Sequence, residues 1–279
     1  MQHWTEEITP KNSLLDLKLK EVWHYRDLMF MFVKRDFVTF YKQTILGPLW
    51  FFVQPLLTTI MYVIVFGNIA KISTDGLPPI LFYLCGITFW NYFSECFTKT
   101  STVFKDNANM FGKVYFPRLV MPLSIVFSGL IKLSIQFLLF ILLLLWYMYQ
   151  SANVHPNLYI LLTPYLVILM AVIALGAGMI ISSLTTKYKD LIFLITFGIQ
   201  LLMYATPVIY PISSLPEKYA FIIKANPLSA VIETFRFAFT GSGTFSWMHL
   251  GYSSVFAFAL LAIGAIIFNK VEKTFMDTV

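Results

Sequence analysis

Long apolar runs alternate along the chain with short polar segments that carry most of the charged residues. Six of these runs are long enough to form membrane-spanning helices, because a helix needs about 20 apolar residues to cross the hydrocarbon core of a bilayer. The predicted spans are 46–69, 77–98, 119–149, 159–185, 191–210 and 248–268. We therefore expect an all-α membrane protein whose residues 1–279 form one transmembrane domain.

Two further segments do not fit a plain bundle of six spans. Residues 13–41 place apolar side chains at helical spacing among charged ones, which is typical of an amphipathic helix in the cytoplasmic membrane interface. A simple membrane anchor and a docking surface for a cytosolic partner both fit this pattern. Residues 211–240 are apolar but contain Pro211, Pro216 and Pro227. They predict short re-entrant helices at the outer face, with an ordinary surface loop as the plainer alternative.

The distribution of lysine and arginine predicts the orientation, because cytoplasmic loops of membrane proteins are enriched in both. With both termini in the cytoplasm, fifteen of the 20 Lys and Arg residues fall on the cytoplasmic side and four on the outer side, with Lys132 inside a span. The opposite orientation would break this rule. We therefore expect a multi-pass protein of the cytoplasmic membrane with both ends inside.

Composition supports a membrane protein. Hydrophobic residues make up 58% of the chain and charged residues 12%, about half the charged fraction of a soluble domain. The basic residues behind the net charge of +6 lie mainly in the predicted cytoplasmic segments and are not gathered on one soluble domain, so nucleic acid is not expected as a partner. Cys85 and Cys96 lie in one apolar run at a separation too large for a disulfide on a helix. Residues 1–10 are polar and acidic, so no cleavable signal peptide is expected.

Candidate chemistry is sparse in the sequence. The four histidines do not pair with Cys, Asp or Glu at ligand spacing, so no metal site is expected. No Walker-type loop occurs, so the chain itself should not hydrolyse ATP. Gly176 and Gly178 predict close helix packing within an apolar helix. Glu95 and Lys99 are spaced for a local ion pair. Lys132, the one cation deep in a span, should face a polar lumen or pair with an acid.

Aromatic residues crowd the first two predicted spans. Belts of Trp and Tyr at the membrane interfaces account for most of them. Aromatic side chains on inward faces would instead offer platforms for the C–H faces of sugar rings. The candidates for such a path are Tyr62, Phe66, Phe89, Trp90, Tyr92 and Phe93.

Short motifs follow one another along nearly the whole chain. They are WHYRDL at 23–28, Arg35-Asp36, YKQTILGPLW at 41–50, Phe89-Trp90, Asn107, KVYFPR at 113–118, KYKD at 187–190, TPVIY at 206–210, NPL at 226–228, Arg236, Glu272, Phe275 and Asp277. In this order they resemble the motifs of polysaccharide-exporting ABC type-2 permeases. The chain departs from that family at Phe40, where a basic residue is common, and at Asn269, Lys270 and Lys273, where arginines are common.

The resemblance implies the permease subunit of an ABC exporter that moves lipid-linked polysaccharide (O-antigen, capsule or teichoic acid) across the cytoplasmic, or inner, membrane. It implies a homodimer in membrane lipid, served by two copies of a separate ABC ATPase that bind ATP and Mg²⁺. The chain itself would then hold no cofactor and would not be an enzyme.

The resemblance also implies roles for particular residues. Contacts with the ATPase are expected at Arg26, Asp27, Arg35, Asp36, Lys113 and Arg118. The lipid-linked glycan would enter near the turn that contains Gly47 and Trp50. An outer re-entrant gate would contain Pro207, Tyr210, Asn226, Pro227 and Arg236.

Three alternatives remain open. An ABC type-2 exporter of drugs or small lipids would lack a wide, aromatic-rich path. An intramembrane glycosyl or phospholipid transferase would need clustered catalytic acids or histidines near one interface. An ion-coupled secondary transporter would need acidic residues in mid-span, where Lys132 is the only ionisable candidate.

Overall fold

The structure, a computed structural model, describes residues 19–42, 44–150, 152–188 and 190–274. The first part of the predicted 13–41 helix and the motif residues Phe275 and Asp277 lie outside the described residues. The described α-helices are α1 (Leu19–His24), α2 (Arg26–Lys42), α3 (Trp50–Tyr62), α4 (Pro79–Ser101), α5 (Val103–Asp106), α6 (Ala108–Phe111), α7 (Val120–Tyr149), α8 (Thr163–Thr185), α9 (Leu191–Tyr204), α10 (Glu217–Ala225), α11 (Pro227–Thr240) and α12 (Trp247–Thr274).

Shorter helical elements complete the fold, and the described part of the chain contains no strand. They are the 3-10 helices η1 (Gly47–Leu49), η3 (Leu158–Leu162) and η4 (Ile212–Ser214) and the π-helix η2 (Val63–Ile69). The π-helix continues α3, so the two form one long rod with a change of winding. Such π segments are rare and often lie at functional sites.

The described residues contain four helical segments long and apolar enough to cross a membrane. They are Gly47–Ile69, Val120–Tyr149, Leu158–Thr185 and Trp247–Glu272, and Leu191–Tyr204 is apolar but shorter. α4 has 23 residues, about 34 Å at the rise of an α-helix, but carries Asn91, Glu95 and Lys99 among its apolar residues. The chain is thus an all-helical, multi-pass membrane protein.

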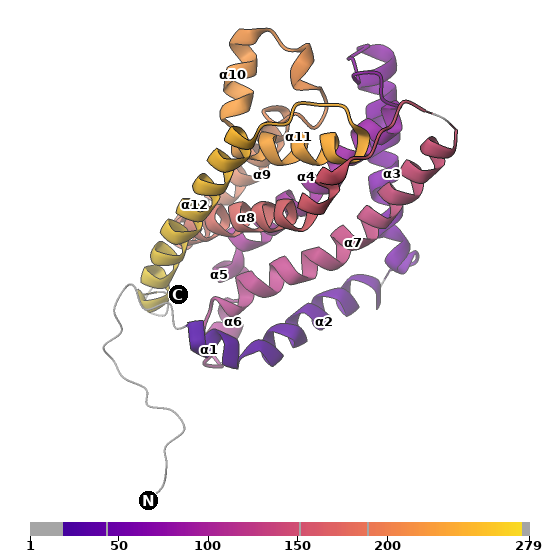
Figure 1. The fold of residues 1–279 in the computed structure, drawn as a ribbon. Helices are drawn as coiled ribbons and strands as arrows, with labels where there is room; N and C mark the ends of the chain where they lie inside the picture. Colours follow the sequence, from indigo (N-terminus) through magenta and orange to yellow (C-terminus); the bar gives the residue numbers. More distant parts are fainter. Residues whose placement is uncertain (1–18, 43, 151, 189, 275–279) are drawn as a thin grey trace, which may run out of the picture.

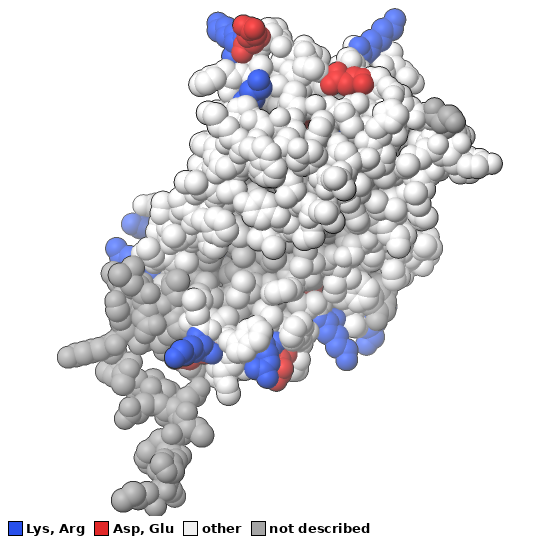
Figure 2. Space-filling model, viewed as in Figure 1, with Lys and Arg blue, Asp and Glu red and all other residues white. Residues whose placement is uncertain are grey.

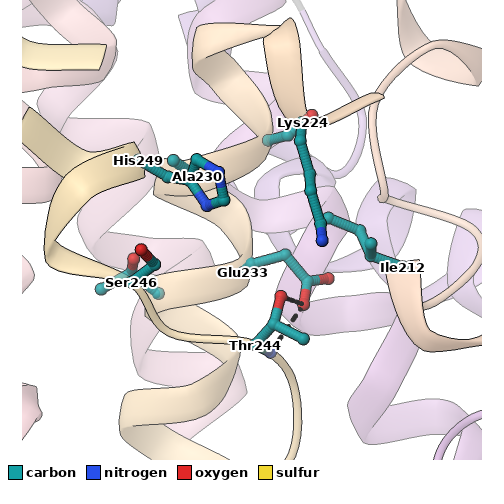
Figure 3. Close-up of a pocket in the computed structure, with 9 residues that line it drawn as sticks. Ile212, Lys224, Ala230, Glu233, Thr244, Ser246 and His249 are labelled. Carbon is teal, nitrogen blue, oxygen red and sulfur yellow. Dashed lines mark hydrogen bonds between the residues drawn. The ribbon is translucent and has the colours of Figure 1, made fainter. Parts of the chain in front are cut away.

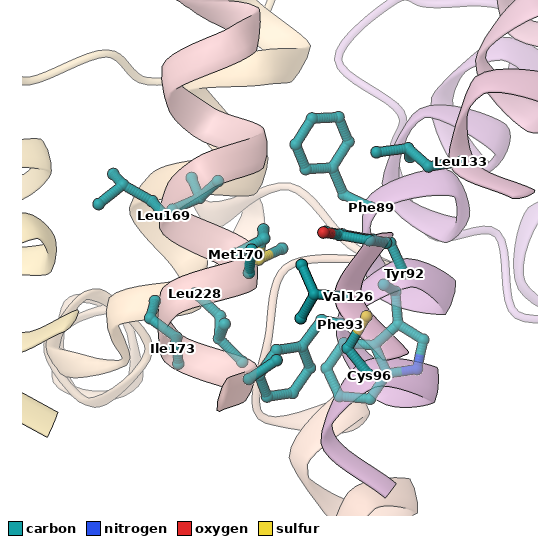
Figure 4. Close-up of a cluster of buried hydrophobic side chains, with 14 of the residues drawn as sticks. Phe89, Tyr92, Phe93, Cys96, Val126, Leu133, Leu169, Met170, Ile173 and Leu228 are labelled. Carbon is teal, nitrogen blue, oxygen red and sulfur yellow. The ribbon is translucent and has the colours of Figure 1, made fainter. Parts of the chain in front are cut away.

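α4 is the central helix of the fold. It packs against α3, α7, α8 and α11, while α8 lies between α4 and α12, and α2 lies along α7 (Figure 1). α10 and α11 lie at one end of the molecule, and α1 and α6 lie at the other (Figure 1). Figure 4 shows the packed core beside α4, where Phe89, Tyr92, Phe93, Met170 and Leu228 meet. α4 is buried over most of its length because α3, α7, α8 and α11 pack around it.

Charged residues gather at the two ends of the molecule. Figure 2 shows Lys, Arg, Asp and Glu at both ends of the face in view and a broad band without them in between. Large apolar side chains such as Leu142 of α7, Phe193 of α9 and Val255 of α12 are exposed. In a membrane protein, lipid covers such side chains. Cys85 and Cys96 are both free and buried, which confirms that they form no disulfide.

The predicted close packing at Gly176 and Gly178 is confirmed, because α8 approaches a different helix at each glycine. A Cβ atom on Gly176 would lie 2.7 Å from the backbone carbon of Leu260 on α12. A Cβ atom on Gly178 would lie 2.6 Å from the side chain of Thr100 on α4. Small residues allow this closeness, and the van der Waals contacts that follow hold membrane helices together.

Several expected boundaries differ from those observed; the last helix, for example, is expected to end at 268 but ends at Thr274. The helix expected over 13–41 is broken at Tyr25 into α1 and α2. The helix expected to reach 210 ends at Tyr204. Pro207 explains the early end, because proline lacks the N–H that a helix needs and disfavours helical geometry at the preceding residue.

We predict that Gly176→Ala lowers stability by about 1–3 kcal/mol, the usual cost of overpacking a close contact. The matched control is Gly251→Ala on α12, where an added Cβ meets nothing within 4 Å. That control should leave stability unchanged or raise it slightly, since alanine favours a helix. Thermal unfolding of the purified protein in detergent measures both. Equal melting temperatures for the two variants would contradict the close approach of α8 and α12.

Candidate functional site

α2 is amphipathic and lies with its apolar side against α7. Met29, Phe32 and Val33 are buried, and Phe32 packs on Phe116 with ring centroids 5.8 Å apart. The expected contact residues Arg26 and Asp27 point outward, with the Asp27 side chain 88% exposed. Spacing of three and four residues explains how one helix buries one side and exposes the other. The exposed side is therefore a charged surface along the end of the molecule.

Arg35 and Asp36 bind one another on this surface. Arg35 Nη2 donates a hydrogen bond of 2.8 Å to Asp36 Oδ1, and the guanidinium lies 4.9 Å from the ring centroid of Phe32. Adjacent residues on a helix do not usually face each other, but the length of the arginine side chain permits this contact. The two charges therefore form one dipolar unit.

The loop after α6 contains two expected contact residues in different settings. Lys113 is exposed, whereas Arg118 is partly buried against α12. The backbone N–H of Arg118 donates to Glu272 Oε1 at 3.3 Å, and its Nη1 donates to the carbonyl oxygen of Glu272. Burial lowers the pKa of the Arg118 guanidinium, and the nearby Glu272 carboxylate partly opposes this change. The structure thus ties this loop to the C-terminal helix.

A tight turn joins α2 to α3. Gly47 has φ of 51°, in the left-handed region that glycine adopts without strain. The apolar side chains of Ile45, Leu49 and Trp50 are exposed around this turn. The turn expected to admit the lipid-linked glycan therefore presents an apolar surface next to the charged surface of α2.

A polar cavity of about 430 Å³ opens between α3, α4 and α7. Its lining residues are Phe51, Gln54, Asn91, Ser94, Glu95, Thr98, Lys99, Lys132 and Gln136. The predicted pair of Glu95 and Lys99 is confirmed, with Lys99 Nζ 2.7 Å from Glu95 Oε1. Lys132 binds the same oxygen and lines the cavity, so it both pairs with an acid and faces a polar space. Sequence reasoning missed this pair because its members are 37 positions apart.

Two of the expected outer gate residues, Asn226 and Tyr210, form hydrogen bonds to the end of α9 and the segment after it. Asn226 accepts from Leu228 N at 3.0 Å and caps α11, while its Nδ2 donates to Ala205 O and Thr206 Oγ1, each at 2.9 Å. The Tyr210 hydroxyl donates to Tyr204 O at 2.7 Å. The cap explains why α11 begins where it does. The side chain of Asn226 therefore joins the segment after α9 to the start of α11.

Pro227 is the first residue of α11, a position that suits proline. Its carbonyl oxygen accepts a hydrogen bond of 2.9 Å from Ser253 Oγ of α12. The Tyr252 hydroxyl donates to Ala225 O at 3.0 Å. α12 therefore holds the junction between α10 and α11.

Arg236 forms a buried ion pair with Glu233, and their side chains are 1% and 2% exposed. Arg236 Nη2 donates to the carbonyl oxygen of Pro207 at 2.7 Å, and the guanidinium lies 4.0 Å from the ring centroid of Phe82 on α4. Glu233 also accepts from Thr244 N at 3.1 Å (Figure 3). A charge is buried this deeply only when it is paired and hydrogen-bonded. Sequence reasoning named Arg236 but not Glu233 as a site residue.

A small pocket lies beside this pair, lined by Lys224 of α10, Glu233 of α11 and His249 of α12 (Figure 3). Its volume is about 20 Å³, enough for a water molecule and not for a larger ligand. Among the described residues, no group of three or more His, Cys, Asp or Glu could hold a metal ion.

The six candidate path aromatics fall into two groups. Phe89, Trp90, Tyr92 and Phe93 are buried inside the chain, against α7, α8 and α11 (Figure 4). Tyr62 and Phe66 lie half-buried on α3 and η2, with ring centroids 5.3 Å apart. The Tyr62 hydroxyl contacts the sulfur of Met203 on α9 at 3.5 Å. Of the six candidate rings, only these last two are partly exposed.

The family model described as ABC-2 type transporter matches residues 27–240. The chain belongs to the ABC-2 type transporter family. The matched range runs from the start of α2 to the end of α11 and contains every expected site residue except Arg26. The charged surface of α2, the polar cavity and the turn at Asn226 are therefore parts of an ABC-2 transporter domain.

Curated relatives match this ABC-2 chain over most of its length. The O-antigen export system permease protein RfbA of Klebsiella pneumoniae is 28% identical over 266 residues, which cover 94% of this chain and 99% of that protein. RfbA of Myxococcus xanthus is 25% identical and covers 79% of this chain and 83% of itself. The polysialic acid transport protein KpsM of Escherichia coli is 23% identical, over 88% of this chain and 93% of KpsM.

We predict that Arg236→Met destabilises this ABC-2 chain by about 3–5 kcal/mol, because it leaves the Glu233 carboxylate buried without its partner. The double variant Glu233→Gln with Arg236→Met should recover part of the loss, and a double-mutant cycle measures that coupling. Arg35→Met is the control, since the exposed pair with Asp36 contributes at most about 1 kcal/mol. Thermal unfolding is measured on five proteins: the wild type, Glu233→Gln, Arg236→Met, the double variant and Arg35→Met. A loss at Arg236 no larger than that at Arg35 would refute the structural role of the buried pair.

Proposed function

We propose that the chain is the transmembrane permease subunit of an ABC exporter that moves lipid-linked polysaccharide of the O-antigen, capsule or teichoic-acid type across the cytoplasmic membrane. The observation that carries this proposal is the ABC-2 match over residues 27–240, together with likeness along nearly the full chain to permeases named for O-antigen and polysialic acid. ATP and Mg²⁺ would bind to a separate ATPase, since the sequence contains no Walker-type loop.

The proposed membrane topology has six crossings with both termini in the cytoplasm. The crossings are α3 with η2, α4, α7, α8, α9 and α12. α1, α2, α5 and α6 then lie at the cytoplasmic end, where most of the lysines and arginines are, as the positive-inside rule requires. α10 and α11 lie at the outer end. Support comes from the uncharged band between the two charged ends (Figure 2).

The charged surface of α2 and the loop at 107–118 are the proposed contacts for two copies of the ATPase. Asp27 and Lys113 are exposed on this surface. Arg118 is bound to Glu272, so its part would be to pass movement of the loop to α12 rather than to touch the ATPase through an exposed charge. ATP binding closes the two ATPases against each other. This movement would tilt α2 and, through the loop that contains Arg118, would move α12 at the same time.

A homodimer is proposed because α3 and α9 leave polar side chains exposed on apolar helices. Gln200 of α9 is exposed, and so is Gln54 of α3, which also lines the polar cavity. An exposed amide inside a membrane needs protein or a water-filled space beside it. A second copy that faces α3 and α9 would provide both, with a glycan path between the copies. Tyr62 and Phe66 are partly exposed on α3 and η2 and are the proposed sugar-stacking residues.

ATP-dependent export tests the proposed function directly. The chain would be reconstituted with its partner ATPase subunit in inverted vesicles whose outer leaflet contains lipid-linked polysaccharide. Transport should occur only with both subunits, the glycan and hydrolysable ATP. Export of glycan by the chain alone, or transport of drugs and small lipids but no glycan, would reject the proposal.

We predict that exchanging the charges of Arg35 and Asp36, as Arg35→Asp with Asp36→Arg, weakens ATPase binding about tenfold, the effect of losing about one favourable charge contact. The exchange keeps the net charge and the mutual pair, so membrane insertion should persist. The matched control exchanges Glu217 and Lys218, adjacent charges exposed at the opposite end. Affinity of the detergent-solubilised chain for the purified ATPase is the measurement. If both exchanged variants bind the ATPase with equal affinity, Arg35 and Asp36 are not part of the docking surface.

We also predict that Tyr62→Ala slows export by about two- to tenfold, the value of one aromatic stacking contact, without a comparable change in melting temperature. Tyr92→Ala should instead lower stability by about 2–5 kcal/mol, because Tyr92 is buried in the core. Transport rate and thermal unfolding are measured on both variants. Unchanged export by Tyr62→Ala would place this ring outside the glycan path.

A further inference from the structure

The polar cavity between α3, α4 and α7 contains more polar chemistry than helix packing requires. On α4 it takes Asn91, Ser94, Glu95, Thr98 and Lys99, which recur three and four positions apart and therefore share one face of the helix. Every other lining residue except Phe51 is also polar or charged. Its volume of about 430 Å³ lies within the roughly 300–1,000 Å³ of typical small-molecule sites. The cavity is therefore large enough for a ligand.

The charge of the cavity favours an anion. Its charged lining residues are Lys99, Lys132 and Glu95, so one positive charge is in excess. Both ammonium groups bind the same oxygen of Glu95, which holds them on one side of the space. The Lys132 side chain is only 17% exposed, which strengthens its attraction for an anion. An anionic ligand would neutralise the excess charge.

The neutral side chains of the cavity are suited to an acceptor with several oxygens. Asn91 and Gln136 are joined by a long hydrogen bond of 3.4 Å, which a stronger acceptor would replace. Ser94 and Thr98 supply hydroxyl groups on the same face of α4. Hydrogen bonds from ammonium groups to phosphate oxygens are among the strong ones in proteins. Phosphate and diphosphate groups fit this set of donors.

The position of the cavity gives the source of the anion. Lys99 lies two residues before the end of α4, and Asn91 lies ten residues before it, about 15 Å along the helix. With the proposed orientation, the cavity therefore extends from the cytoplasmic interface to about the middle of a hydrocarbon core roughly 30 Å thick. The headgroup of an inner-leaflet lipid lies at the cytoplasmic interface, which is where the cavity begins.

We propose that the polar cavity binds the phosphate or diphosphate group that joins the lipid to the glycan, and carries that group from the inner interface toward the membrane centre. Lys132 and Lys99 are its cationic ligands. Glu95 is the internal counter-ion that holds both lysines when the cavity is empty and that the incoming anion displaces. This inference rests on the proposed export function, which supplies the lipid-linked substrate.

Binding of a short prenyl diphosphate tests the proposal. The probe is farnesyl diphosphate, titrated into the complex of the chain with its ATPase in nanodiscs and measured by calorimetry. Farnesol and inorganic diphosphate are the two comparison ligands. Farnesyl diphosphate should bind more tightly than either. If farnesol binds as tightly as farnesyl diphosphate, the cavity does not recognise the anion. If inorganic diphosphate binds as tightly, the cavity does not recognise a lipid headgroup in particular.

Two substitutions should shift the affinity in opposite directions. Lys132→Gln should weaken farnesyl diphosphate binding about tenfold, the effect of losing one charge-assisted hydrogen bond, while Lys132→Arg should keep it within about twofold. Glu95→Gln should tighten binding, because it removes the competing carboxylate. Lys71→Gln, an exposed lysine outside the cavity, is the control and should change nothing.

A purely structural ion cluster would give a different result. Lys132→Gln and Glu95→Gln would then lower the melting temperature, with affinities equal to that of Lys71→Gln, and this outcome would overturn the proposal. If Glu95→Gln does not fold, the contrast between Lys132→Gln and Lys132→Arg still decides. Export by the wild-type complex is measured separately. If the wild-type complex exports glycan but Lys132→Gln does not change the affinity for farnesyl diphosphate, only the cavity proposal is rejected. If Lys132→Gln weakens that affinity but the wild-type complex exports no glycan, only the proposed function is rejected.

Discussion

A lipid bilayer offers no water to polar groups, so a charged side chain within the apolar helices needs a partner inside the protein. This requirement fixes the central helix α4 at two points. Near one end, Glu95 binds Lys132 of α7. Near the other end, Arg236 of α11, paired with Glu233, lies over the ring of Phe82. Between these points α4 is buried among aromatic and aliphatic side chains. The helices around α4 are therefore positioned by charge at both ends and by packing in the middle.

α12 connects the two ends of the molecule. It has 28 residues, about 42 Å of helix. At one end Glu272 holds the loop that contains Arg118, and at the other Ser253 binds the carbonyl oxygen of Pro227. Along its length it packs closely on α8 at Gly176. A rigid helix with these three attachments would move the α10–α11 segment whenever the loop that contains Arg118 moves, and this coupling needs no continuous chain of polar contacts between the two ends.

The apolar runs predicted the helical class and most helices, because length and hydrophobicity are local properties of the sequence. Which helices contact one another was harder to predict from the sequence. Periodicity shows which face of a helix is polar but not which helix it meets, so Lys132 was singled out without Glu95 as its partner. The same limit applies to aromatic side chains. Trp90 and Tyr92 lie in the core while Tyr62 lies at a partly open surface, although all three come from the same aromatic-rich stretch.

The pair between Glu95 and Lys132 also bears on how the chain is made. The ribosome synthesises α4 before α7, so the carboxylate of Glu95 is already in the chain when Lys132 emerges. A lone lysine at the centre of a membrane helix costs about 2.5–3.5 kcal/mol to insert. A waiting counter-ion on an earlier helix would offset part of that cost during biosynthesis. Because the acid precedes the base along the chain, Glu95 is available as a partner for Lys132 when α7 enters the lipid.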